Sequence, residues 1–234
     1  MATRLDKHSD CIGCHHKNSL DQNSQRDAIE QSRFLGAIRA GYLAAKVGAL
    51  VGLSQHISFQ NKNGLSQIYN ERINAQTAAD SLVFVHDDVW IDDYYFFDRI
   101  AEGLTKADVI GVAGNKRRVA LQPAWPFMDE KFAWDSAENL SGAVAHGKNP
   151  FGQISRFGSV LAACELLDGV LLAANASVLR IPGVYFDPRF DFHFYDMDFC
   201  RSARAAGLSL STWPLCLTHQ SGASFGSRVW RGGL

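Results

Sequence analysis

Short apolar runs alternate with segments of helical spacing through the middle of the chain. The alternation predicts strands and helices, in turn, at residues 56–60, 65–79, 82–85, 93–105 and 108–113. Strand, helix, strand, helix and strand in this order predict an α/β fold with a central sheet of parallel strands. Ligands of such sheets bind at the carboxyl ends of the strands. We therefore expect functional residues directly after residues 59, 85 and 113.

The second half of the chain is less regular. Residues 119–160 contain three prolines and two tryptophans, which indicates an insertion of loops and short pieces. Strand-like runs return at residues 166–174 and 208–217. A helix is expected between them, at residues 196–206, and Gly207 is suited to cap its C-terminal end.

Length and charge exclude several classes of protein. A chain of 234 residues suits one domain over residues 1–234, with a weakly patterned part at 1–55 and a mobile glycine-rich tail at 221–234. The chain has 23 Lys and Arg against 24 Asp and Glu, so a general attraction to nucleic acid is not expected. A helix is expected over residues 26–53. Because its apolar part contains charged side chains, we do not expect a transmembrane segment.

The five cysteines are too few and too scattered for a disulfide scaffold. No apolar signal core follows the first basic residues, so we expect a cytoplasmic protein, at most peripheral at the inner membrane face. Cys11 and Cys14 form a Cys-x-x-Cys pair next to two histidines. The pair can be a structural zinc site or an incidental or reactive pair, since no second pair lies at zinc-finger spacing.

Two adjacent carboxylates follow the expected strand at residues 82–85. Asp87 and Asp88 come directly after Val85 and His86, at the edge of the sheet where ligands bind. Charges placed there need compensation, and Mg²⁺ or Mn²⁺ shared with substrate phosphates would supply it. The alternative is that both residues begin a loop and cap the next helix.

A second acidic cluster and a late histidine also follow expected strands. Asp196 and Asp198 lie two residues apart among aromatic residues, where burial would raise the pKa of a carboxyl toward that of a useful base. The alternative is that Asp196 caps a helix while Asp198 pairs with Arg201. His219 follows the last strand-like run, where a lone histidine is more often structural.

These elements together resemble the family 2 glycosyltransferases, especially their shorter bacterial members of GT-A fold. The resemblance runs from about residue 57 to residue 226. Its matching segments, in order, are 64–70, 85–89, 166–169, 183–187, 195–201 and His219. The resemblance implies a three-layer α/β/α sandwich with a mostly parallel central sheet.

The resemblance also implies an activity, namely transfer of a sugar from a nucleotide-diphosphate donor to a hydroxyl of a saccharide or lipid-linked acceptor, with inversion. Bacterial polysaccharide or glycoconjugate synthesis is the implied setting, and Mn²⁺ or Mg²⁺ the implied cofactor. Asp196 would be the catalytic base, and Asp88 and His219 the metal ligands. The implied donor-binding residues are Thr3, Arg4, Asn61, Ser66, Asn70, Asp87 and Lys116, and the implied acceptor-side residues are Asp168, Gly169 and Asp198.

The chain departs from the family pattern in four places. His86 stands where an acidic residue is common, and Tyr195 stands where a Glu usually precedes the base. The second strand is followed by Asn61 rather than by an Asp that would contact the nucleotide base. The first strand is expected to be truncated, with residues 2–4 as its end.

Two other functions remain open from the sequence. A nucleotidyltransferase or metal phosphohydrolase could use Asp87 and Asp88 on a similar sheet, although no glycine-rich phosphate loop is present to support it. A catalytically degenerate GT-A module, which binds a sugar or a partner without turnover, would account for the departures from the family pattern.

Overall fold

The computed structural model describes residues 9–14, 53–58, 61–75 and 79–220. Its strands are β1 (Ser9–Cys14), β2 (Leu53–Ser58), β3 (Ser81–His86), β4 (Val89–Ile91), β5 (Val109–Gly111), β6 (Ala113–Asn115), β7 (Leu140–His146), β8 (Gln153–Arg156), β9 (Leu166–Leu167), β10 (Leu171–Asn175), β11 (Leu210–Thr212) and β12 (Leu217–His219). Its helices are α2 (Leu65–Asn74), α3 (Phe96–Leu104), α4 (Ala176–Leu179) and α5 (Tyr195–Ala205).

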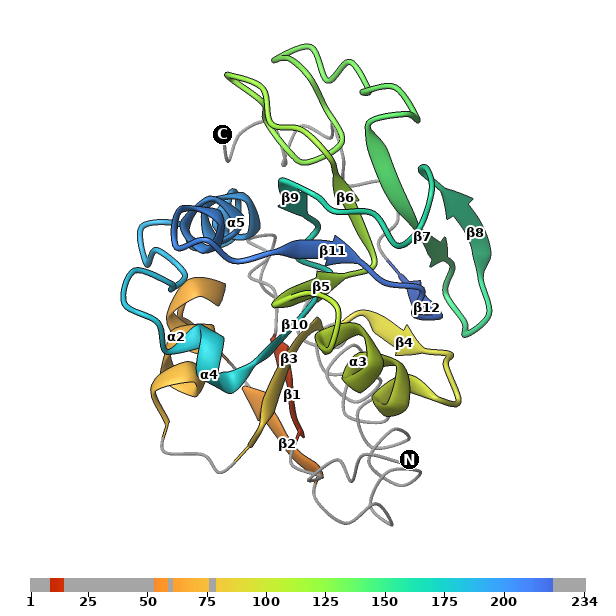
Figure 1. The fold of residues 1–234 in the computed structure, drawn as a ribbon. Helices are drawn as coiled ribbons and strands as arrows, with labels where there is room; N and C mark the ends of the chain where they lie inside the picture. The colour runs from red at the N-terminus through yellow and green to blue at the C-terminus, as the bar shows by residue number, and fades with distance from the viewer. Residues whose placement is uncertain (1–8, 15–52, 59–60, 76–78, 221–234) are drawn as a thin grey trace, which may run out of the picture.

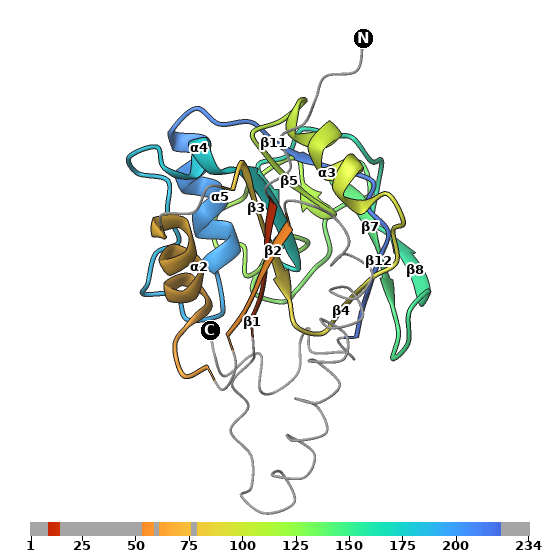
Figure 2. The same ribbon diagram turned by 90° about the horizontal axis from the view of Figure 1, so that it is seen from below.

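A six-stranded sheet forms the centre of the described part of the chain, in the order β11-β5-β10-β3-β1-β2. The pairings β1–β2, β1–β3 and β5–β11 are parallel, whereas β10 runs antiparallel to both β3 and β5. The sheet is therefore mixed. Helices α2, α4 and α5 lie on one side of it and α3 on the other (Figures 1 and 2). This arrangement confirms the predicted three-layer α/β fold.

A second sheet begins at the edge of the first sheet where β3 and β5 end. Its order is β4-β12-β7-β6-β9, and β8 pairs with β7. The chain crosses from one sheet to the other between β3 and β4, at Val112 between β5 and β6, and at residues 168–170 between β9 and β10. Each crossing comes directly after a buried strand. The crossings therefore bring side chains from distant parts of the chain close together.

Apolar side chains explain why these segments form buried elements. Residues 82–85 of β3 are buried on both faces, as expected of a central strand covered by helices on each side. On the side of the sheet that α2 and α5 cover, the ring of Phe186 stacks on that of Phe199, with 4.3 Å between the ring centroids. The rings of Phe186 and Tyr69 meet edge to face, with 5.0 Å between their centroids. Helix α5 ends before Gly207, whose φ of +83° is the left-handed conformation that glycine adopts readily.

Two expectations about the chain are made more precise by the structure. The first strand that the structure describes is the six-residue β1, and the Cys-x-x-Cys pair lies on this strand. Residues 2–4, where the first strand was expected to end, lie outside the described residues. Residues 119–160, expected to be loops and short pieces, contain the strands β7 and β8.

Most of the helix expected at residues 26–53 lies outside the described residues, as does the tail at 221–234. Leu53, the last residue of that expected helix, is the first residue of β2. Among the helices that the structure describes, none has the length and apolar character needed to cross a bilayer.

Removing the Phe186 ring should destabilise the fold strongly. Phe186 is fully buried, and Phe→Ala changes at buried sites cost about 3–5 kcal/mol. We expect a loss of this size in the free energy of unfolding for Phe186→Ala, measured by urea denaturation. Phe151→Ala is the matched control, since Phe151 is 80% exposed. An equal loss in both variants would contradict this account of the core.

Candidate functional site

The candidate site lies where the chain crosses between the two sheets. Asp88 lies in the turn between β3 and β4, and Asp168 in the link between β9 and β10. The backbone ties these crossings together, because the amide of His86 donates to the carbonyl of Val170 at 3.2 Å and the amide of Gln220 donates to the carbonyl of Asp88 at 2.8 Å. Residues more than a hundred positions apart therefore meet at one place.

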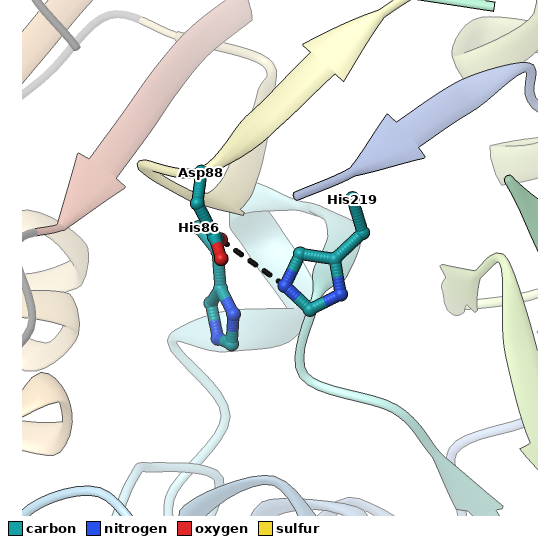
Figure 3. Close-up of side chains that lie close together, drawn as sticks. All are labelled: His86, Asp88 and His219. Carbon is teal, nitrogen blue, oxygen red and sulfur yellow. Dashed lines mark ion pairs between the residues drawn. The ribbon is translucent and has the colours of Figure 1, made fainter. Parts of the chain in front are cut away.

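His86, Asp88 and His219 form a compact cluster at this junction. One potential ligand atom from each residue lies within 4.8 Å of the others. Figure 3 shows the imidazole of His219 turned toward the carboxylate of Asp88, and Nε2 of His219 lies 3.1 Å from Oδ1 of Asp88. The cluster thus combines the predicted ligands Asp88 and His219 with a histidine that the sequence analysis treated as a departure from the pattern.

The charges of the cluster depend on one another. Burial alone would raise the pKa of Asp88, but the hydrogen bond from His219 and the nearby imidazoles lower that pKa to about 2. Burial would lower the pKa of His219, yet the hydrogen bond and charge of Asp88 raise it overall. Burial lowers the pKa of His86. The site therefore presents an anionic carboxylate beside one imidazole that favours its neutral form.

A hydrogen bond outside the cluster orients His86. Nε2 of His86 lies 2.8 Å from the hydroxyl of Tyr195, the first residue of α5. A partner on one ring nitrogen fixes the rotation of an imidazole and leaves the other nitrogen for a metal ion. Tyr195 therefore links the metal-binding candidate to the helix that carries Asp196.

The donor set suits a divalent transition metal. Two imidazole nitrogens and one carboxylate oxygen are available, and imidazole favours first-row transition metals whereas Mg²⁺ favours oxygen ligands. Three protein ligands also leave positions open for substrate atoms. Of the two predicted ions, Mn²⁺ therefore fits this cluster better than Mg²⁺.

Asp196 is a carboxylate with unusual surroundings. Its side chain lies mostly within the protein and accepts hydrogen bonds from the backbone amides of Gly169 at 3.1 Å and Met197 at 2.8 Å. Burial raises its pKa to about 7, and the nearby charge of Asp168 acts in the same direction. A carboxyl with this pKa can exchange a proton near neutral pH, as a general base must.

Gly169 allows this arrangement. A Cβ atom at position 169 would overlap the hydroxyl of Tyr195 and lie 3.1 Å from Cβ of Asp196. Only a residue without a side chain lets the β9–β10 link approach α5 this closely. Gly169, predicted from the resemblance as an acceptor-side residue, thus has a defined structural role beside Asp196.

Two of the predicted donor-binding residues, Ser66 and Asn70, make hydrogen bonds to the backbone of residues 186–190. Ser66 is buried and donates from Oγ to the carbonyl of Phe190 at 2.7 Å. Asn70 bonds to both backbone groups of Phe186. The two side chains fasten α2 to the segment at residues 186–190.

The remaining predicted residues are placed as follows. Asn61 forms a local turn with Asn63, and Asp198 pairs with Arg201 at 2.7 Å, the alternative that the sequence had left open. Lys116 donates to the carbonyl of Glu138 at 2.8 Å and to the hydroxyl of Ser159 at 3.1 Å. Asp87 shares the turn of Asp88, whereas Thr3 and Arg4 lie outside the described residues.

Sequence reasoning missed two parts of the site. His86 is a member of the cluster. Its position two residues before Asp88, at the end of β3, was a usable signal. The second missed part is a cavity of about 220 Å³ between Asp168, His219 and the inserted segment. Its other lining residues are Trp125, Trp134, Val144, His146, Ser155 and Phe157.

Comparison with known proteins adds a likeness of fold. No protein-family model matches the chain, and no curated protein sequence matches it. A structure of GalNAc-T7 with UDP, GalNAc and Mn²⁺ is similar at a TM-score of 0.51 and 8% identity, and the match covers 93% of this chain and 44% of that one. The fold is of the GT-A type.

Two further solved structures are similar at lower scores. The catalytic domain of Drosophila β1,4-galactosyltransferase 7, in complex with xylobiose, has a TM-score of 0.48 and 8% identity, with 88% of this chain and 64% of that chain covered. TarS 1–349 of S. aureus has a TM-score of 0.46 and 11% identity, with 91% and 60% covered. This chain thus spans less than two thirds of the length of each of the three. The likeness to the GalNAc-T7 structure, at 8% identity, concerns the fold alone.

The raised pKa of Asp196 should make the stability of the fold depend on pH. The folded protein, with a pKa of about 7, keeps a proton that the unfolded chain loses near its ordinary value of 3.8. This contribution is complete below pH 4 and is lost as the pH rises through 7. The amount is at most about 4 kcal/mol, because one pKa unit corresponds to about 1.4 kcal/mol.

Asp196→Asn should remove this dependence. We expect the free energy of unfolding of the unchanged protein, measured by urea denaturation from pH 4 to pH 8, to fall relative to that of Asp196→Asn. Asp198→Asn is the control, since it removes a carboxylate from the same helix turn and leaves Asp168 and Gly169 in place. Parallel pH curves for the unchanged protein and Asp196→Asn would show that Asp196 has an ordinary pKa.

Proposed function

We propose that the protein is a metal-dependent, inverting glycosyltransferase that moves a sugar from a nucleotide diphosphate to a hydroxyl acceptor. The observation that carries this proposal is the position of Asp196, a carboxyl with a pKa of about 7. It is held beside the His86–Asp88–His219 cluster by the hydrogen bond between Tyr195 and His86. A base and a candidate diphosphate-binding centre therefore share one edge of a GT-A fold.

The residues present divide the reaction between them. Asp196 takes the proton from the acceptor hydroxyl, whose oxygen bonds to the anomeric carbon as the bond from that carbon to the diphosphate breaks. Asp168 orients the acceptor. His86, Asp88 and His219 would hold Mn²⁺, which when bound would neutralise charge on the leaving diphosphate. A single displacement with the base opposite the leaving group inverts the configuration.

The donor side and the setting are proposed from the resemblance. Thr3, Arg4, Asn61, Asp87 and Lys116 are proposed to contact the nucleotide. We propose that the protein acts in the cytoplasm or at the inner membrane face, in bacterial polysaccharide or glycoconjugate synthesis, with a saccharide or lipid-linked acceptor.

Nucleotide binding should depend on the metal. We expect one of UDP, GDP and dTDP to bind in calorimetric titrations when Mn²⁺ is present and to bind about tenfold or more weakly when Mg²⁺ replaces it, because the cluster offers two nitrogen ligands. Asp88→Asn should abolish the metal-dependent binding. Asp98→Asn is the control, since Asp98 is exposed on α3. Binding of none of the three nucleotides would refute a working donor site and favour a degenerate module.

Asp196→Asn should separate binding from turnover. The variant keeps the cluster, so the nucleotide and Mn²⁺ should bind as before, whereas loss of the base should lower turnover by about 10²–10⁴-fold. The measurement is sugar transfer followed by product analysis, which also reveals a nucleotidyltransferase through the release of pyrophosphate. Full transfer activity in Asp196→Asn would show that another group accepts the proton.

A further inference from the structure

The inserted segment builds most of the cavity next to the candidate site. Six of the eight residues that line this cavity of about 220 Å³ lie between residues 125 and 157, and the other two are Asp168 and His219. We infer that this cavity is the acceptor pocket and that it holds one neutral pyranose ring of a saccharide. The term acceptor rests on the proposed function, whereas the chemistry of the ligand follows from the lining of the cavity.

Aromatic rings supply a flat apolar wall. The rings of Trp134 and Phe157 are nearly parallel, with 12° between their planes and 6.1 Å between their centroids, and Trp125 meets Phe157 edge-on at 5.0 Å. Trp134 is also packed against Phe127 at 5.3 Å, yet it remains 53% exposed. Such a ring is held in place before any ligand arrives. The C–H groups on one face of a pyranose form an apolar surface that fits against it.

A carboxylate supplies the polar side. Oδ2 of Asp168 accepts a hydrogen bond from Nε1 of Trp125 at 2.8 Å, and Oδ1 accepts one from the amide of Val170 at 3.0 Å. An ionised carboxylate can accept about four hydrogen bonds, so each oxygen keeps capacity for a sugar hydroxyl. The two bonds to the protein hold the carboxylate in a fixed orientation.

The lining also argues against a charged ligand group. Among the described residues that line the cavity, none is Lys or Arg, which are the usual partners of phosphate groups, and His219 is the one lining residue that also belongs to the candidate diphosphate-binding centre. The volume is below the 300–1,000 Å³ typical of sites for drug-sized ligands. Both observations favour a single neutral ring over a nucleotide or a phosphorylated group.

The pocket adjoins the proposed base. Asp168 lines the cavity, and the amide of the next residue, Gly169, donates to Asp196 at 3.1 Å. A ring held between Trp134 and Asp168 would therefore lie next to the segment whose amide contacts Asp196. This neighbourhood is what transfer to a sugar hydroxyl requires.

The test is saturation-transfer NMR on the full chain with methyl glycosides of glucose, galactose, xylose and N-acetylglucosamine, each with and without UDP and Mn²⁺. We expect at least one glycoside to bind, and Trp134→Ala to raise its Kd about tenfold. Trp134→Phe, which keeps a ring, should retain most of the affinity. Tyr94→Ala is the control, because Tyr94 is 87% exposed and does not line the cavity.

The outcomes separate this inference from the proposed function. No glycoside binding while UDP with Mn²⁺ binds, equal binding to the Trp134→Ala variant, or displacement of the glycoside by UDP would each overturn the pocket assignment and leave the donor site intact. Glycoside binding that depends on Trp134, together with no binding of any nucleotide, would support the pocket and overturn the proposed transferase.

Discussion

The close approach of the β9–β10 link to α5 decides how the parts of the site lie relative to one another. Gly169 has no side chain, so its backbone lies against Tyr195 and its amide binds Asp196. Tyr195 in turn contacts His86 at the end of β3. Burial is the main influence on the carboxyl of Asp196, and it raises the pKa of this group to about 7. One steric constraint thus connects the candidate metal ligands with the candidate base.

The two sheets contribute different things to this site. The first sheet is buried between helices and supplies rigid strand ends, of which His86 is one. The second sheet, built partly from residues 119–160, supplies His219 at the end of β12 and the aromatic wall around Trp134. A rigid scaffold that carries variable inserted segments is a common way to change the ligand without changing the fold.

The sequence predicted correctly those elements whose residue pattern has one clear structural meaning. The apolar run at residues 82–85 and the helix that ends at Gly207 were predicted, because buried strands and glycine C-caps have clear signals. The strand at Ser9–Cys14 was not predicted, because it contains polar and cysteine residues and lacks the expected apolar run. The strands of the inserted segment were missed because prolines and tryptophans surround them.

The same division holds for the site. The sequence by itself determined the α/β fold class and the candidates Asp88, Asp196 and His219, because strand ends and acidic spacing are local properties. Only the tertiary structure decided that His86 joins the cluster, that Ser66 and Asn70 bind backbone, and that Trp134 and Asp168 enclose a cavity. These facts depend on contacts between segments up to 130 or so positions apart, and such contacts form only when two sheets bring the segments together.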